Sequence, residues 1–113
     1  AFLKPDFSVI GPANPVDRDT FALLYLTGLG AVRPAVATGA VAPSAPPFAE
    51  TTDRPVVTVA GLSSEVAYSG LAPGLIGLYQ INFRIPAGAP TGPQDVVVTL
   101  RGAASNTARI AIR

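Results

Sequence analysis

The amino-acid sequence predicts an all-β fold, a single antiparallel β-sandwich of about seven to nine short strands. Three observations lead to this prediction. Apolar and polar residues alternate along several short runs, as they do in half-buried strands. Turn-forming Gly and Pro residues, 11 and 12 in number, bound these runs. No run longer than about five residues that lacks Gly and Pro places its apolar residues with the period of an amphipathic helix. A length of 113 residues suits one domain.

The chain is predicted to have two parts, an extended N-terminal strand with its connector at residues 1–13 and a sandwich domain at 14–113. The run Gly11-Pro12-Ala13-Asn14-Pro15 is typical of a stiff, extended connector. Two interpretations of the strand stay open. It forms an edge of its own sandwich, or it leaves its domain and completes the sheet of a second copy.

Alternation in the first ten residues identifies the side chains that a neighbouring sheet would receive. Leu3, Pro5, Phe7 and Val9 alternate with polar residues, which is the pattern of a half-buried strand. Pro5 has no backbone N–H, so this strand belongs at a sheet edge. In the strand-donation hypothesis the inter-subunit residues are Leu3, Phe7, Val9 and Ile10.

The middle of the chain is predicted to supply a central strand and a hairpin. Residues 21–27 are apolar on both faces, as in a strand buried on both sides or covered by a partner. Residues 55–60 and 65–69 are expected to pair as a hairpin about Gly61. The loop-rich stretch at 32–53 is expected to contribute one or two short edge strands.

Three C-terminal strands are predicted at 78–85, 94–101 and 107–112, joined as an antiparallel meander. In each of them apolar residues alternate with polar ones, so one face of each strand points to the core. The residues expected to share one core are Leu24, Tyr79, Ile81, Phe83, Val96, Val98 and Ile110.

A local motif narrows the sandwich to an Ig-like one. Gly77-Leu78-Tyr79-Gln80-Ile81 has the spacing of the tyrosine corner of Ig-like domains, with Ile81 in the place of a disulfide cysteine. The Tyr79 hydroxyl would then bond to backbone at residues 72–75. The alternative is that Tyr79 is simply a large core residue. Two strands follow this motif, where a plain Ig topology has one.

Several motifs in order along the chain extend this interpretation to residues 14–112. They are Asn14-Pro15, Leu23–Gly30, Ala67–Gly74, Gly77–Asn82, Ile85-Pro86, Ser105-Asn106 and Ile110-Ala111-Ile112. Together they resemble the Ig-like C-terminal domain common in secreted proteins of Solibacter-type acidobacteria. The resemblance implies a β-sandwich exported from a bacterial cell. It implies no catalytic residues. The sequence begins at Ala1 and has no Met, so we expect either that a leader was removed or that the sequence is a fragment of a longer protein.

Composition argues against an enzyme. Cys and His are absent, which excludes disulfides, thiolate nucleophiles, the commonest metal ligand and the usual general base. Asp17 and Asp19 form a close pair, but calcium needs about six to eight oxygen ligands. Basic residues form no stripe for nucleic acid, and no apolar run approaches the ~18 residues of a membrane span. We therefore expect no catalytic site, no cofactor and no metal.

Low charge suggests association. Only 13% of residues are charged and the net charge is +1, where a soluble domain has about 25% charged residues. Either small Ala side chains account for this composition, or neighbouring molecules cover much of the surface.

Two functions follow from these observations. One is an extracellular structural subunit that assembles with other copies of itself into a filament or surface polymer, by N-terminal strand donation and apolar packing. The alternative is a cell-surface adhesion or glycan-binding Ig-like module. A glycan platform needs exposed aromatic side chains, and we expect most Tyr and Phe residues on core faces. This favours the structural subunit.

Overall fold

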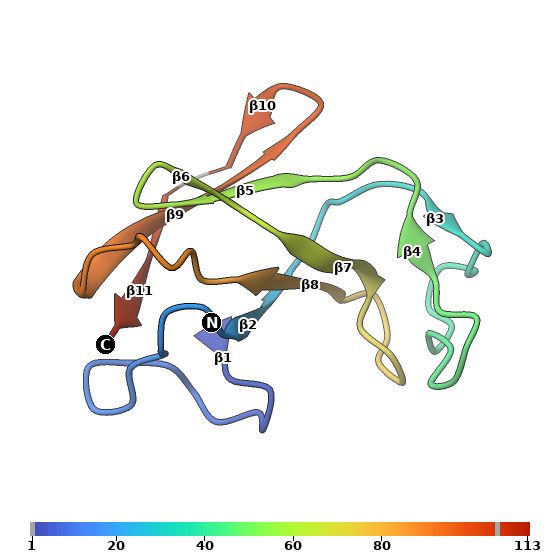
Figure 1. Cartoon of the computed structure of the whole chain (residues 1–113). Coiled ribbons are helices and arrows are strands. Elements are labelled where there is room, and N and C mark those ends of the chain that lie inside the picture. The colour runs from blue at the N-terminus through green and yellow to red at the C-terminus, as the bar shows by residue number, and fades with distance from the viewer. Residues whose placement is uncertain (1, 106) are drawn as a thin grey trace.

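Two antiparallel β-sheets make up the computed structural model, which describes residues 2–105 and 107–113 (Figure 1). Ala1, at the start of the expected N-terminal strand, and Asn106, in the Ser105-Asn106 motif, lie outside these residues. No described residue is helical, and the all-β prediction is confirmed. Within the described ranges there is accordingly no helix that could span a membrane.

The described residues form 11 strands, more than the number expected, because several contain only two residues. A two-residue strand has no alternation by which a sequence could reveal it. In chain order the strands are β1 (Phe2–Leu3), β2 (Phe21–Leu26), β3 (Val32–Arg33), β4 (Glu50–Thr51), β5 (Val56–Val59), β6 (Leu62–Ser64), β7 (Val66–Leu71), β8 (Tyr79–Arg84), β9 (Gly92–Leu100), β10 (Ala103–Ala104) and β11 (Ala108–Ile112).

The strands divide into the two sheets of a β-sandwich. The first sheet has the order β1-β2-β8-β7-β4-β3, and the second has β10-β9-β5-β6 with β11 also paired to β9. Buried residues of both sheets belong to one core cluster, so the two sheets pack face to face as a β-sandwich. Figure 1 shows β3, β4 and the long loop between them at one end of the first sheet. β9, β10 and β11 all follow β8, so Tyr79 does not begin the strand before the last one, where a tyrosine corner lies, and that interpretation of the motif is wrong.

Two predicted connections are wrong, because the chain changes sheets where a hairpin is expected. β8 does not pair with β9, since residues 86–93 hold three Pro residues and carry the chain across to the second sheet. β9 and β11 pair as predicted. Around Gly61 the strand that pairs with β5 is β6. The chain then crosses at Glu65, and β7 joins the first sheet beside β8.

The core lies between the sheets and is centred on Phe83, which has 0% exposure. β2 runs between β1 and β8, so the predicted central strand is confirmed. The predicted core is confirmed as well: buried residues are Ile81, Phe83, Val96, Val98 and Ile110, with Leu24 and Tyr79 half-buried against them.

The N-terminal segment, defined here as residues 2–16, is not an extended strand, and that prediction is wrong. After the two residues of β1 the chain turns back, with Lys4 N donating to Ser8 O at 2.9 Å. Leu3 and Val9 then form an antiparallel bridge. The reason lies at Asp6, whose carboxylate accepts bonds from the Ser8 backbone N–H at 2.9 Å and from the Ser8 hydroxyl at 2.7 Å. Such a side-chain bond stabilises a turn and ends the strand.

Both sides of the sandwich are closed by segments that cross between the sheets. On one side, β6 and β7 are nearly continuous and belong to different sheets. On the other side, the N-terminal segment starts in the first sheet and ends at Val16, which pairs in parallel with Ile112 of the second sheet. Val16 N donates to Ala111 O at 2.9 Å, and Arg113 N donates to Val16 O at 2.8 Å. Crossing segments of this kind cover the sheet edges against further pairing.

Truncation of Phe83 tests the central place of this ring. Phe83→Ala is expected to lower the free energy of unfolding by about 3–5 kcal/mol, because it removes a fully buried ring from a closed core. Urea denaturation measures the loss. The matched control is Phe7→Ala, the same change at a ring that is 64% exposed, with an expected effect within about 0.5 kcal/mol. Equal effects of the two variants would contradict the assignment.

The ion pair that ties Asp17 to the C-terminus predicts a pH dependence. Arg113 Nε donates to Asp17 Oδ1 at 2.7 Å, and this bond lowers the pKa of Asp17 below its usual value of 3.8. A lowered pKa stabilises the fold above 3.8, and the stabilisation is lost as pH falls through the lowered pKa. Asp17→Asn should therefore reduce the urea midpoint at about pH 7 and not at about pH 2. An identical reduction at both pH values would refute this account.

Candidate functional site

The two side chains of β1 face opposite ways from the prediction, because the core-facing residue lies one position earlier in the chain. Phe2, not Leu3, enters the core: it is 7% exposed, and its ring meets Phe83 edge to face with centroids 6.0 Å apart. Phe2 pairs with Leu24 and Leu3 with Leu23, so Leu3 lies on the outer face of the first sheet. A shift by one residue exchanges the two faces of a strand. The large ring of Phe2 was the signal for this register in the sequence.

The predicted inter-subunit residues do not form one row. Leu3 is half-buried beside Leu23 on the outer face, whereas Ile10 packs against the core. Phe7 and Val9 are each 64% exposed. Phe7 is the turn residue, with a φ of 66°, a value uncommon outside Gly. These four side chains therefore cannot enter one groove together, since the turn between Leu3 and Val9 separates them.

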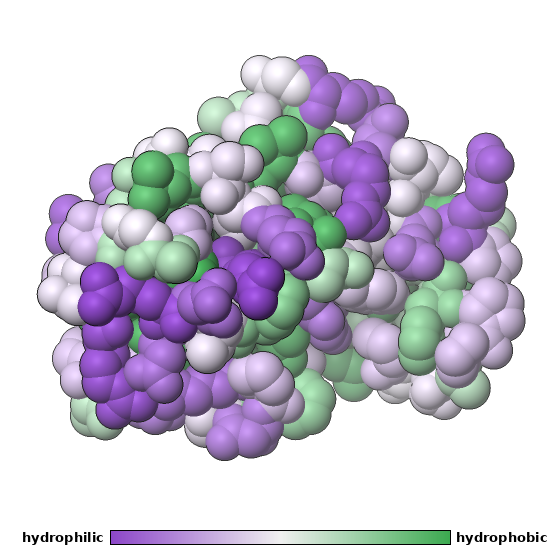
Figure 2. Space-filling view, in the orientation of Figure 1, coloured by the Kyte–Doolittle hydropathy of each residue, from purple (hydrophilic) through white to green (hydrophobic). Residues whose placement is uncertain are grey.

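Asn14 ties the turn of the N-terminal segment to its connector. Its Nδ2 donates to Ser8 Oγ at 3.1 Å and to Val9 O at 3.0 Å, and its Oδ1 accepts from Lys4 Nζ at 2.8 Å. Backbone bonds between Gly11 and Asn14 in both directions close the connector as a tight loop. The N-terminal segment, which covers the edge of β2, is thus a small folded unit. Figure 1 shows it as the blue loops beside β1. In Figure 2 strongly hydrophilic side chains gather in the same part of the molecule.

The Tyr79 hydroxyl has a different partner from the one predicted. It donates to Gly30 O at 2.5 Å, and the expected bond to residues 72–75 is wrong. Because β2 and β8 are antiparallel and Leu26 pairs with Tyr79, the loop that follows β2 passes beside the start of β8. The hydroxyl therefore holds the loop after β2. The same loop lines a cavity of about 390 Å³ with the chain at residues 35–40, walled mainly by small apolar residues.

The aromatic side chains are distributed differently from the prediction. The chain has five Phe and three Tyr residues, and those that pack in the main core are Phe2, Tyr79 and Phe83. The expectation that most aromatic residues lie on core faces is wrong. The remaining ones lie outside the core, half-buried or exposed: Phe7, Phe21, Tyr25, Phe48 and Tyr68. For Phe21 and Tyr25, alternation could not indicate which face is the core, since residues 21–27 are apolar on both faces.

Chemically reactive side chains are not gathered anywhere in the described residues. No group of three or more His, Cys, Asp or Glu side chains there could hold a metal ion. The buried polar side chains Thr51 and Ser69 bond to each other at 2.8 Å.

Removal of the Asn14 side chain tests how the N-terminal segment is held. Asn14→Ala is expected to lower the free energy of unfolding by about 1–2 kcal/mol, because the turn loses three hydrogen bonds that are partly open to solvent. Hydrogen exchange should accelerate at residues 4–9 and stay unchanged in β8. Uniform acceleration in both regions would mean that Asn14 supports the whole fold and not this segment.

Comparison with protein-family models, with curated proteins and with solved structures gave no significant match to this chain. The resemblance to the Ig-like domain of acidobacterial secreted proteins therefore stays a prediction. Function is argued below from the geometry of the N-terminal segment and of the first sheet.

Proposed function

We propose that the chain is a non-catalytic, extracellular structural subunit that self-assembles by exchanging its N-terminal segment with another copy. The observation that carries the proposal is that this segment closes one whole side of the sandwich. It supplies Phe2 to the core, β1 to the first sheet and Val16 to the second. The extracellular part of the proposal comes from the sequence resemblance.

Exchange would preserve the contacts of the segment, because an identical segment from a second copy fits the same site. Without it, the edge of β2 and the space beside Phe83 would be open. Such an opening binds the segment that evolved to fill it, which is why domain swapping requires few new contacts. The exchanged unit would be residues 2–10, a folded turn that carries Phe2, in place of the extended strand that the sequence predicts. Val16 lies beyond the connector and would stay paired with Ile112 of its own sandwich.

The connector at residues 11–15 is the place where the chain would open. It contains Pro12 and Pro15, and it could span up to about 17 Å when extended. Opening requires loss of the two backbone bonds between Gly11 and Asn14 and of the three bonds that join the Asn14 side chain to Lys4, Ser8 and Val9. If each copy donates to the next, the head-to-tail contact does not close on itself and a filament grows. A chain in which only 13% of residues are charged favours such association.

A disulfide trap tests the exchange, and the absence of Cys from the chain makes the trap specific. Leu3 and Leu23 are directly opposed across β1 and β2, so Leu3→Cys with Leu23→Cys places two thiols at disulfide distance. Oxidation of the monomer before assembly should lock the segment and prevent assembly. Oxidation after assembly should give a ladder of covalent multimers on a non-reducing gel.

Two further results complete this test. The single variant Leu3→Cys is the control, and it should assemble and give no ladder beyond dimers. Sedimentation velocity and negative-stain imaging of the unmodified chain measure assembly itself. Covalent monomers alone after oxidation of an assembled sample, or monomers at every concentration, would refute segment exchange.

A further inference from the structure

The outer face of the first sheet carries an aromatic and amide surface that the N-terminal segment does not explain. In β2 the core-facing residues are Ala22, Leu24 and Leu26, and in β8 they are Ile81 and Phe83. Their alternate neighbours therefore point outward. The outward residues are Phe21, Leu23 and Tyr25 from β2, Gln80, Asn82 and Arg84 from β8, and Tyr68 from β7. Leu23 is buried beside Leu3, with 5% exposure, and the other six are half-buried.

Register places an amide pair between two tyrosines. Tyr25 is opposite Gln80, and Asn82 is opposite Tyr68. The Gln80 side chain donates from Nε2 to Asn82 Oδ1 at 2.7 Å. Within the described part of the chain no other bond engages these two side chains, so one amide oxygen and one amino group remain for a ligand. An acceptor and a donor side by side suit the hydroxyl groups of a sugar.

Tyr68 is held in place on this face. Its hydroxyl donates to Leu71 O at 2.8 Å, and Phe48 packs edge-on against it with ring centroids 6.2 Å apart. The side chain crosses above Gly70, where a Cβ atom would lie 2.6 Å from the Tyr68 hydroxyl oxygen. Gly70 therefore lets the tyrosine lie along the sheet. A ring held in this way presents a fixed apolar surface at little cost in entropy.

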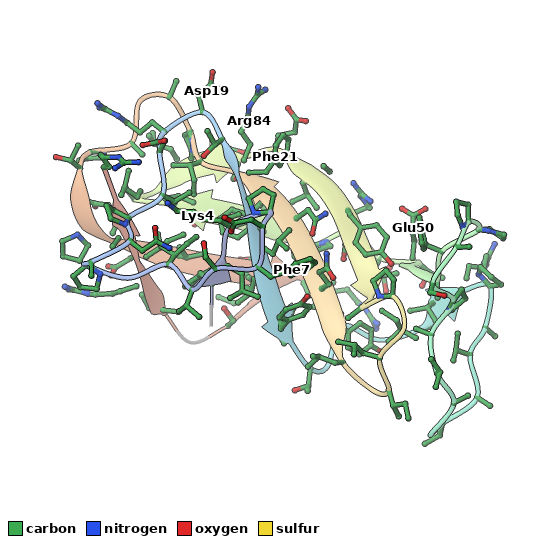
Figure 3. The ribbon with its side chains drawn as sticks, turned by 90° about the horizontal axis from the view of Figure 1, so that it is seen from below. Lys4, Phe7, Asp19, Phe21, Glu50 and Arg84 are labelled. Carbon is green, nitrogen blue, oxygen red and sulfur yellow. The ribbon has the colours of Figure 1, made fainter. Side chains whose placement is uncertain are left out.

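The charged groups at this face are paired at its ends, which leaves its centre neutral. Arg84 lies 3.2 Å from Asp19 and 3.5 Å from Glu65, and its guanidinium stacks 5.5 Å from the centre of the Phe21 ring. Figure 3 looks onto this face and shows Phe21, Arg84 and Asp19 together at one end, with Glu50 at the far side. A neutral ligand fits this arrangement better than an anion does.

We infer that this aromatic–amide face binds a neutral polysaccharide chain. The C–H groups of a sugar ring carry partial positive charge and pack against the negative face of an aromatic ring. Tyr25 and Tyr68 stand on strands separated by β8 and are offset by two residues along it, so their backbones lie about 12 Å apart by the spacing of strands and residues. This distance accommodates a short run of linked sugar rings, with Gln80 and Asn82 bonding to hydroxyls between the two tyrosines. The inference is independent of segment exchange.

Affinity electrophoresis of the full chain in gels that contain hydroxyethylcellulose, xylan or galactomannan tests the inference, with polygalacturonate as the anionic comparison. We expect retardation by at least one neutral polymer and none by polygalacturonate. Tyr25→Ala, Tyr68→Ala and the double variant Gln80→Ala with Asn82→Ala should each weaken that interaction about tenfold or more.

Matched variants separate binding from folding. Val56→Ala, an exposed position on the second sheet, should bind as the unmodified chain does. Tyr25→Phe keeps the ring and should retain most of the affinity, and thermal unfolding confirms that each variant is folded. The inference is overturned if no neutral polymer retards the chain. It is equally overturned if folded Tyr25→Ala and the amide double variant bind normally, or if only polygalacturonate binds.

Discussion

The antiparallel ladder between β2 and β8 is the interaction on which the rest of the structure depends. Its register runs from Phe21 with Arg84 to Leu26 with Tyr79. This pairing sends alternate residues of both strands into the core, where Phe83 is fully buried. It sends the others to the outer face, where they form the aromatic–amide surface. A slip by one residue would exchange the two sets, burying Gln80 and exposing Ile81. Core stability and the chemistry of the outer face thus have one origin.

The two sides of the sandwich are closed by different physical means. β6 and β7 close one side by chain continuity, so that side cannot open without loss of both strands. The N-terminal segment closes the other side through Phe2, a short strand and the turn held by Asn14. Few ladder bonds join it to β2, and most of its hydrogen bonds are internal. A segment with its own internal bonds can move as a unit, which is why exchange between copies is physically reasonable.

The two proposals use adjoining surfaces and would reinforce each other. Leu3 of the exchanged segment lies beside Leu23, which is directly opposite Asn82 in the first sheet. Segment exchange acts at the side of the sandwich, whereas the polysaccharide would lie on the outer face of the first sheet. A polymer of subunits joined through their sides would repeat that face along its length. Weak binding at each copy would then combine into strong attachment, because later contacts form at high effective concentration. Each proposal nevertheless has its own observations: closure by Phe2 for one, and the Gln80–Asn82 pair between tyrosines for the other.

Alternation and turn residues determined the all-β class, the long strands and the core-facing residues such as Ile81, Phe83 and Val98, because period-two burial acts within a single strand. Long-range pairing decided the rest. It placed β8 and β9 in different sheets, directed the Tyr79 hydroxyl to Gly30 and put Tyr25 and Tyr68 on the outer face, where both are half-buried. The Asp6 turn likewise ended β1 after Leu3 and put Phe2 inside. A sequence specifies which residues alternate, but the partner strand decides which of the two faces becomes the core.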